Sequence, residues 1–182
     1  MRRTALAVAC AAATLLVPLR ARAQEPSLER QVKAAFLYKF AGYVEWPANA
    51  FPAHDSPVTI GVYGDEALAR DLTELVKGRT SGGRPVAIVR LKSADPLPDV
   101  RVLFVARSQT EDLPEIAEAA RGKPVLIVAE DEFAIGNGAM INFVLSNGRV
   151  RFEVDLLAVS HGSITLSSRL LAVAQQVLPE AR

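Results

Sequence analysis

The chain has 182 residues, and its 21 Lys and Arg residues nearly balance its 20 Asp and Glu residues. Hydrophobic residues make up 50% of it, which is enough for one domain with a substantial core. Its basic residues are scattered and form no stripe interleaved with aromatic side chains, so the composition excludes a typical nucleic-acid-binding protein.

Residues 1–23 have the features of a secretory signal peptide. Arg2-Arg3 forms the positive start, Ala5 to Leu19 forms the apolar stretch, and Ala21-Arg22-Ala23 is a cleavage site. The apolar stretch is too short to span a bilayer, and no other segment approaches the length of a membrane helix. We therefore predict a cleaved signal peptide, export to the periplasm by the Sec or the twin-arginine route, no membrane insertion, and a single domain at 24–182.

Cysteine and histidine are too few for the common catalytic and metal sites. Cys10, the one cysteine, lies in the signal peptide, so the exported domain has no disulfide, thiol nucleophile or thiolate metal site. His54 and His161 lack the spacing of metal ligands, and the chain has no nucleophile elbow. The sequence predicts no catalytic residue, no metal and no cofactor, and therefore a binding or regulatory protein.

A helix is predicted from Ser27 to Val44. Ser27 can cap its start, and Pro47 ends it, because the residue before a proline disfavours helix. The apolar side chains that recur every fourth residue are Val32, Phe36, Phe40 and Val44. We expect Phe36 and Phe40, on this stripe, to be core residues packed on a sheet.

The stretch from Ala34 to Pro47 holds five of the chain's eleven aromatic side chains. Leu37 and Tyr38 lie off the apolar stripe, and Trp46 follows the end of the helix. One buried face does not account for these three residues. We expect them to lie under the Pro-rich loop that follows, or in a contact with a second copy of the chain or with a partner protein.

Short apolar strands alternate with amphipathic helices through the middle of the chain. The predicted strands are Val58–Gly64, Val86–Leu91, Val100–Ala106 and Pro124–Glu130, and the predicted helices are Asp65–Gly78 and Leu113–Gly122. Strands this apolar are typical of a parallel sheet covered by helices, and the alternation is typical of βαβ units. The predicted fold class is therefore α/β, with a mostly parallel sheet flanked by helices on both faces, a C-terminal β-hairpin and a final helix.

Two of the predicted strands end in residues that form a candidate ligand site. Gly64 ends the first strand and Asp65 follows it, and Glu130 ends the last strand and Asp131 follows it. Small molecules bind α/β sheets at the carboxyl ends of strands, which favours a site here. However, Asp65 and Glu66 at a helix start would repel phosphate, and an acidic run is also typical of a solvated loop. Both interpretations stay open.

Two alternating runs joined by Asn147-Gly148 predict the hairpin, because both turn residues tolerate the positive φ of a type I′ turn. The apolar residues expected on one face are Ile141, Phe143, Leu145, Val150, Phe152 and Val154. Arg149, Arg151 and Glu153 point to the other face and are candidate partner contacts, although such a face often meets only water. The segment Thr165–Val177 predicts the final helix, capped by Ser167 or Ser168.

Two blocks of the sequence resemble the YfiR-like family of exported bacterial proteins. They are VKAAFLYKFAGYVEWP near the start of the exported domain and GAMINFVLSNGRVRFEVDLLAVSHGSITLSSRLLAVA near its end. The resemblance implies an α/β periplasmic protein of a kind that is often a homodimer. It also implies a regulator that represses an inner-membrane diguanylate cyclase by binding its periplasmic domain, which lowers cyclic di-GMP and biofilm formation. A small-molecule receptor with its ligand at the strand ends is the alternative.

Overall fold

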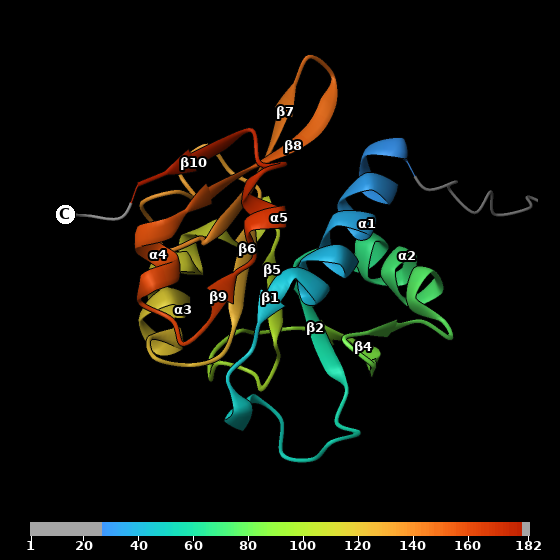
Figure 1. Ribbon diagram of the computed structural model, residues 1–182. Helices are drawn as coiled ribbons and strands as arrows, with labels where there is room; N and C mark the ends of the chain where they lie inside the picture. The colour runs from blue at the N-terminus through green and yellow to red at the C-terminus, as the bar shows by residue number, and fades with distance from the viewer. Residues whose placement is uncertain (1–26, 180–182) are drawn as a thin grey trace, which may run out of the picture.

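A twisted eight-stranded sheet runs through residues 27–179, the part of the chain that the computed structural model describes (Figure 1). Its strands are β2 (Val58–Tyr63), β3 (Thr80–Ser81), β4 (Arg84–Leu91), β5 (Val102–Val105), β6 (Leu126–Ala129), β7 (Ile141–Ser146), β8 (Arg149–Asp155) and β10 (Gln176–Leu178). The strand order is β10-β8-β7-β6-β5-β2-β4-β3. A separate two-stranded sheet pairs β1 (Val44–Glu45) with β9 (Thr165–Leu166). The predicted signal peptide, residues 1–23, lies outside the described residues.

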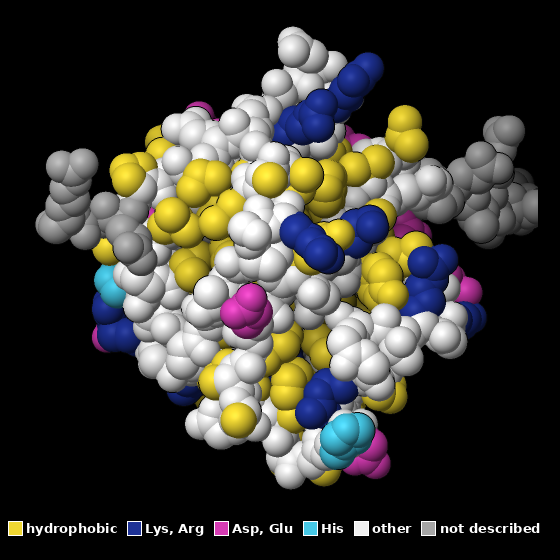
Figure 2. Space-filling model, in the orientation of Figure 1, with side chains coloured by type: hydrophobic (Ala, Val, Ile, Leu, Met, Phe, Trp, Pro, Cys, Tyr) yellow, Lys and Arg dark blue, Asp and Glu magenta, His cyan; other side chains and the backbone are white. Residues whose placement is uncertain are grey.

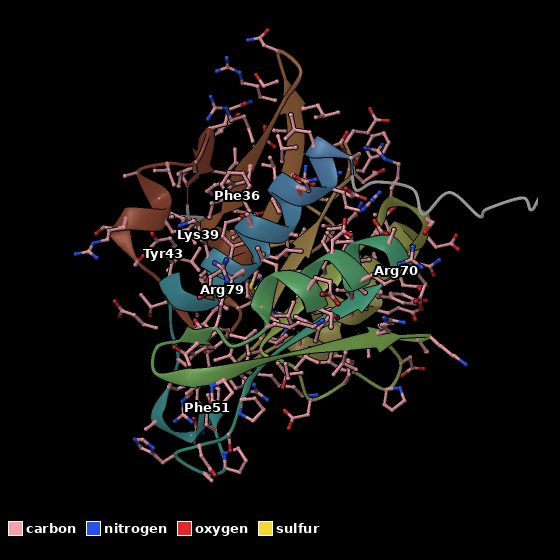
Figure 3. The ribbon with its side chains drawn as sticks, turned by 90° about the vertical axis from the view of Figure 1, so that its right-hand side faces the viewer. Phe36, Lys39, Tyr43, Phe51, Arg70 and Arg79 are labelled. Atoms are coloured by element: carbon pink, nitrogen blue, oxygen red, sulfur yellow. The ribbon has the colours of Figure 1, made fainter. Side chains whose placement is uncertain are left out.

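Helices cover both faces of the sheet, as the sequence predicts. They are α1 (Leu28–Tyr43), α2 (Glu66–Val76), α3 (Leu113–Ala120), α4 (Leu156–Ser160) and α5 (Ser168–Leu171), with the 3-10 turns η1 (Ala48–Ala50) and η2 (Arg107–Asp112). In Figure 1, α1 and α2 lie on one side of the sheet, and α3 and α4 lie on the other. Figure 3 shows α1 and α2 side by side. The α/β fold class is therefore confirmed.

The central strands β4, β2, β5, β6 and β7 are parallel. Every residue of β5 and β6 is buried, as expected for runs as apolar as VLFV and LIVA. The chain runs from β2 through α2 to β4 in one direction, and from β5 through α3 to β6 in the other. Right-handed crossovers in opposite directions place α2 and α3 on opposite faces of the sheet.

The β7–β8 hairpin forms with the predicted turn and register. Asn147 and Gly148 adopt φ values of 52° and 70°, as a type I′ turn requires. The antiparallel pairing joins Phe143 to Phe152 and Leu145 to Val150, so the apolar side chains share one face. Arg149 and Arg151 follow the opposite face, as predicted from the alternation.

The first helix is also confirmed, with Ser27 as its cap. The hydroxyl of Ser27 accepts a hydrogen bond from the N–H of Arg30 at 3.2 Å. The helix ends at Tyr43, one residue before the predicted end, because Val44 turns extended and pairs with Leu166 of β9.

The predicted final helix is wrong in its length. α5 covers only Ser168–Leu171, and Ser167 caps it, but the chain then becomes extended and forms β10. The N–H of Gln175 donates to the carbonyl of Phe152 at 2.8 Å, and β10 continues the sheet beside Glu153–Asp155. An unpaired sheet edge offers these hydrogen bonds, and here they outweigh the helical preference of the segment.

Candidate protein-interaction site

Four phenylalanines hold α1 against the β7–β8 hairpin. The ring of Phe40 lies 5.0 Å from that of Phe152 in an edge-to-face contact and 5.8 Å from that of Phe143. Phe36 lies 5.4 Å from Phe152 and 6.1 Å from Phe143, and Figure 3 shows it on the side of α1 that faces the C-terminal strands. Such pairs stabilise beyond the area they bury. The cluster therefore fixes where the hairpin leaves the body.

Beyond this cluster the hairpin projects from the molecule (Figure 1). β6 pairs with β7 only at Ile141 and Asn142, so the outer half of the hairpin is a two-stranded ribbon. Leu145 lies on the apolar face, as the alternation predicts, but 62% of it is exposed because the body ends before it. The alternating pattern alone cannot show this.

A groove of about 400 Å³ separates the projecting hairpin from the first turns of α1. Its lining from α1 is Leu28, Glu29, Val32 and Phe36, and its lining from the hairpin is Leu145, Gly148, Arg149, Val150 and Arg151. Leu28 is 76% exposed at its rim. The groove is therefore an open, largely apolar surface with two arginines at its edge, a composition suited to binding another protein.

The two arginines that line the groove carry uncompensated positive charge. Arg149 and Arg151 are exposed, and neither forms an ion pair with another residue among 27–179. Figure 2 shows basic side chains on the projecting hairpin at the top of the view and hydrophobic side chains around its base. Glu153 is half-buried on the same face, farther from the tip, and pairs across the sheet with Asn142. The hairpin tip is therefore cationic.

A second, charged cavity shares Glu29 and Leu145 with the groove. Its volume is about 330 Å³, and it contains Lys33, Arg107, Glu130 and Asp131. Lys33 donates to Glu130, and also to Glu29 at 2.5 Å, one turn earlier on α1. The guanidinium of Arg107 lies 3.5 Å from the carboxylate of Asp131.

The ammonium of Lys33 is stabilised by its two carboxylates. Burial lowers its pKa, but the hydrogen bonds and charges of Glu130 and Glu29 outweigh this effect and raise the pKa above its ordinary value of 10.5. Lys33 thus stays charged and ties α1 to the carboxyl end of β6.

The structure separates the four predicted ligand residues. Glu130 and Asp131 line the charged cavity, but Gly64 and Asp65 do not. The carboxylate of Asp65 caps α2 by accepting from the N–H of Leu68 at 2.8 Å. Gly64 is covered by η2, since a Cβ at this position would lie 2.6 Å from the side chain of Gln109. The end of β2 is therefore filled by the chain itself, and the four predicted residues do not share one cavity. A ligand role for Glu130 and Asp131 stays a prediction.

Among the predicted partner contacts of α1, Leu37 needs correction. Its side chain is 0% exposed, because α1 packs against both the sheet and α2, so it has no surface to offer. Tyr38 and Trp46 are half-buried and have contacts within the chain: the Tyr38 hydroxyl donates to the carbonyl of Thr80 at 2.8 Å. Trp46 packs edge-to-face on Phe51 of the Pro-rich loop, in agreement with the expectation that it lies under this loop. A partner role for Tyr38 and Trp46 stays a prediction.

Sequence reasoning missed the α1 wall of the groove. Leu28 and Val32 are apolar residues one turn apart, and Leu28 precedes the periodic stripe. An exposed leucine at a helix start is not unusual by itself. Only the position of the hairpin tip opposite these residues makes them part of a surface.

A comparison with protein families matches residues 30–175 to the YfiR/HmsC-like family. The chain belongs to this family. The matched segment contains the aromatic cluster and the whole hairpin. It leaves out Leu28 and Glu29 of the groove, and Glu29 of the charged cavity. A search of curated proteins finds none with significant similarity. Within residues 27–179, no helix of this YfiR/HmsC-like protein has the length and apolar character needed to cross a membrane.

Proposed function

We propose that this protein is a periplasmic regulator that binds the periplasmic sensor domain of an inner-membrane diguanylate cyclase and represses it. Repression lowers cyclic di-GMP in the cytoplasm and limits biofilm formation. The observation that carries the proposal is the family match over residues 30–175, because the YfiR-like resemblance implies this role. The features of residues 1–23, a positive start, an apolar stretch and a cleavage site, support export to the periplasm.

The geometry of the hairpin supports a binding role. Its tip projects from the body, presents Arg149 and Arg151 without an ion pair among 27–179, and borders an open apolar groove. Apolar area supplies affinity in protein interfaces, and charges at the rim set the register and the partner. We place the cyclase contact on this tip, with Glu153 at its inner border and with Tyr38 and Trp46 as a separate, weaker candidate surface.

The test is direct binding between the purified chain and the periplasmic domain of a cyclase encoded beside it, measured by biolayer interferometry. The double variant R149E/R151E is expected to bind at least about tenfold more weakly, because it reverses both charges of the tip. Arg70→Glu is the matched control, since Arg70 is an exposed arginine on α2, away from the hairpin (Figure 3). No binding by the unmodified chain, or equal weakening by Arg70→Glu, would contradict the proposal.

The oligomeric state is part of the same proposal. The family resemblance implies a homodimer, and light scattering on the purified chain measures it. A monomer at all accessible concentrations would remove the dimer from the proposal without affecting cyclase binding.

A small-molecule receptor is the second candidate function, and the charged cavity favours it. Lys33, Arg107, Glu130 and Asp131 place both signs of charge around about 330 Å³, which suits a small polar molecule. A thermal-shift screen of polar metabolites tests this, because a ligand that binds only the folded chain raises its melting temperature. A hit that loses its effect in Glu130→Gln would support the site; no hit would argue against it.

A further inference from the structure

The outer edge of β8 is paired along only half of its length. β10 pairs with Glu153–Asp155, and the carbonyl of Phe152 accepts from Gln175. No strand within residues 27–179 pairs with Arg149–Phe152 on this side. In an antiparallel strand, the backbone N–H and C=O groups of successive residues point alternately to its two sides. The outward carbonyl of Phe152 therefore places the N–H and C=O of Val150 at the same open edge.

The apolar groove runs along this open edge. The consecutive residues from Gly148 to Arg151, in the turn and β8, form one wall together with Leu145 of β7. Leu28, Val32 and Phe36 of α1 form the other wall. The groove therefore occupies the track that β10 would follow if it continued toward the tip. A strand laid there would meet backbone hydrogen-bonding groups on one side and an apolar helix face beside it.

We infer that the groove receives an extended segment of a partner protein, which adds to β8 at Val150 as a further strand and carries alternating apolar and acidic residues. Side chains of an added strand alternate between the two faces of the sheet. Those on the inner face lie beside Val150 and the α1 wall, which calls for apolar residues. Those on the outer face lie beside Arg149 and Arg151, which calls for acidic residues. The identity of the partner as the cyclase domain rests on the proposed function.

The positive charge of Arg149 and Arg151 favours an acidic partner segment in the groove over a second copy of the chain. Two β8 edges paired about a two-fold axis would bring the arginines of both copies together, which is destabilising. Glu29 is the acidic residue in the groove lining, and it is already paired with Lys33. The C-terminal end of β10 lies beside Asp155, so the chain leaves the sheet at the end of β8 opposite to the groove.

Amide hydrogen exchange of the purified, ¹⁵N-labelled chain tests the inference at single residues. In the free chain, the Val150 amide should exchange rapidly, whereas the Arg151 amide, which faces β7, should be protected. Saturating cyclase periplasmic domain should slow exchange at Val150 at least about tenfold and leave Arg151 unchanged, because strand addition forms new backbone hydrogen bonds. Protection of Val150 in the free chain would show that the chain covers this edge itself and would overturn the inference.

A pair of variants isolates the backbone donor. Val150→Pro removes the N–H at the open edge, and Val150→Ala removes a similar part of the side chain but keeps the N–H. The proline variant should bind the cyclase domain at least about tenfold more weakly than the alanine variant. Circular dichroism checks that both variants fold. If the proline variant does not fold, amide exchange at Val150 tests the inference instead.

Model peptides separate this inference from the proposed function. The peptide acetyl-VEVEVEV-amide should shift the resonances of Val150 and Val32, whereas acetyl-VKVKVKV-amide should not. If the cyclase domain binds without slowing exchange at Val150, the inference is wrong and the proposed function stands. If the acidic peptide binds at Val150 and the cyclase domain does not bind, the groove is confirmed and the proposed partner is wrong. Protection of Val150 that grows with the chain's own concentration would indicate a second copy and overturn the inference.

Discussion

Replacing Phe40 by alanine tests whether the aromatic cluster is the main attachment of the hairpin to α1. Phe40 is 1% exposed, and its ring contacts those of Phe36, Phe143 and Phe152 at 5.0 to 5.8 Å. Truncating a buried phenylalanine costs about 3–5 kcal/mol, since it loses the transfer free energy of the ring and leaves a cavity. A domain of this size is stable by about 5–15 kcal/mol, so the variant should lose a large part of its free energy of unfolding.

Urea unfolding followed by the fluorescence of Trp46 measures this loss. Trp46 is the chain's one tryptophan, and its indole N–H donates to the carbonyl of Ala41 at 3.3 Å, so its signal reports the end of α1 directly. Phe133→Ala is the matched control: Phe133 is 66% exposed, and its loss should change stability by less than about 0.5 kcal/mol. A loss below about 2 kcal/mol in Phe40→Ala, with an unchanged urea slope, would refute the central role of the cluster.

The remaining predictions concern a charged pair, a phenol and two glycines. Lys33→Met should lower the free energy of unfolding by about 2 kcal/mol at pH 8, a cost between those of exposed and buried ion pairs. The pKa of Lys33 in the folded chain is raised above 10.5. The difference in free energy of unfolding between this variant and the unmodified chain should therefore shrink as the pH rises beyond that value. The hydrogen bond of the Tyr63 hydroxyl to the carboxylate of Asp112, at 2.8 Å, raises the pKa of the phenol, so an absorbance titration should show one late ionisation that Tyr63→Phe abolishes. Gly138→Ala should be less stable than Gly136→Ala by at least about 2 kcal/mol. Both glycines have a positive φ, but only a Cβ at position 138 would clash, at 2.1 Å from the Cβ of Ala117. Equal free energies of unfolding for the two variants would exclude this clash.

Local patterns in the sequence are sufficient to predict most elements of this fold. The hairpin follows from Asn147-Gly148 because the turn geometry is set by residues that are adjacent in the chain. The buried strands β5 and β6 follow from their continuous apolar composition, and the α1 start follows from the cap at Ser27. Each of these signals is local, so no knowledge of distant neighbours is needed.

The errors occur where a distant segment decides the outcome. Leu37 lies off the four-residue stripe, but α1 has a second buried face because α2 packs beside it, with Arg30 paired to Asp71 at 2.5 Å. Gly64 stands at a strand end where ligands commonly bind, but η2 from another part of the chain fills that place. A helical wheel or a strand-end rule cannot include such neighbours.

The same limit applies to the candidate site. Sequence alternation correctly predicts that Arg149 and Arg151 share one face and that Leu145 lies on the other. It does not predict that Leu145 is exposed, because it carries no information on where the sheet partner of β7 ends. The groove exists because β6 and β10 both stop before the hairpin tip, and α1 begins opposite to it. These are three end points of separate elements, and no local pattern relates them.

The arginines at the tip also explain how this protein can keep an unpaired strand edge beside an apolar groove. Such an edge is a template for pairing with other chains, and natural sheets protect it with charged side chains. Arg149 and Arg151 would meet the same charges in a second copy, so they oppose self-pairing. They would instead meet opposite charges in an acidic strand of a partner. One pair of residues thus disfavours aggregation and favours the proposed partner, since both effects follow from the sign of the charge.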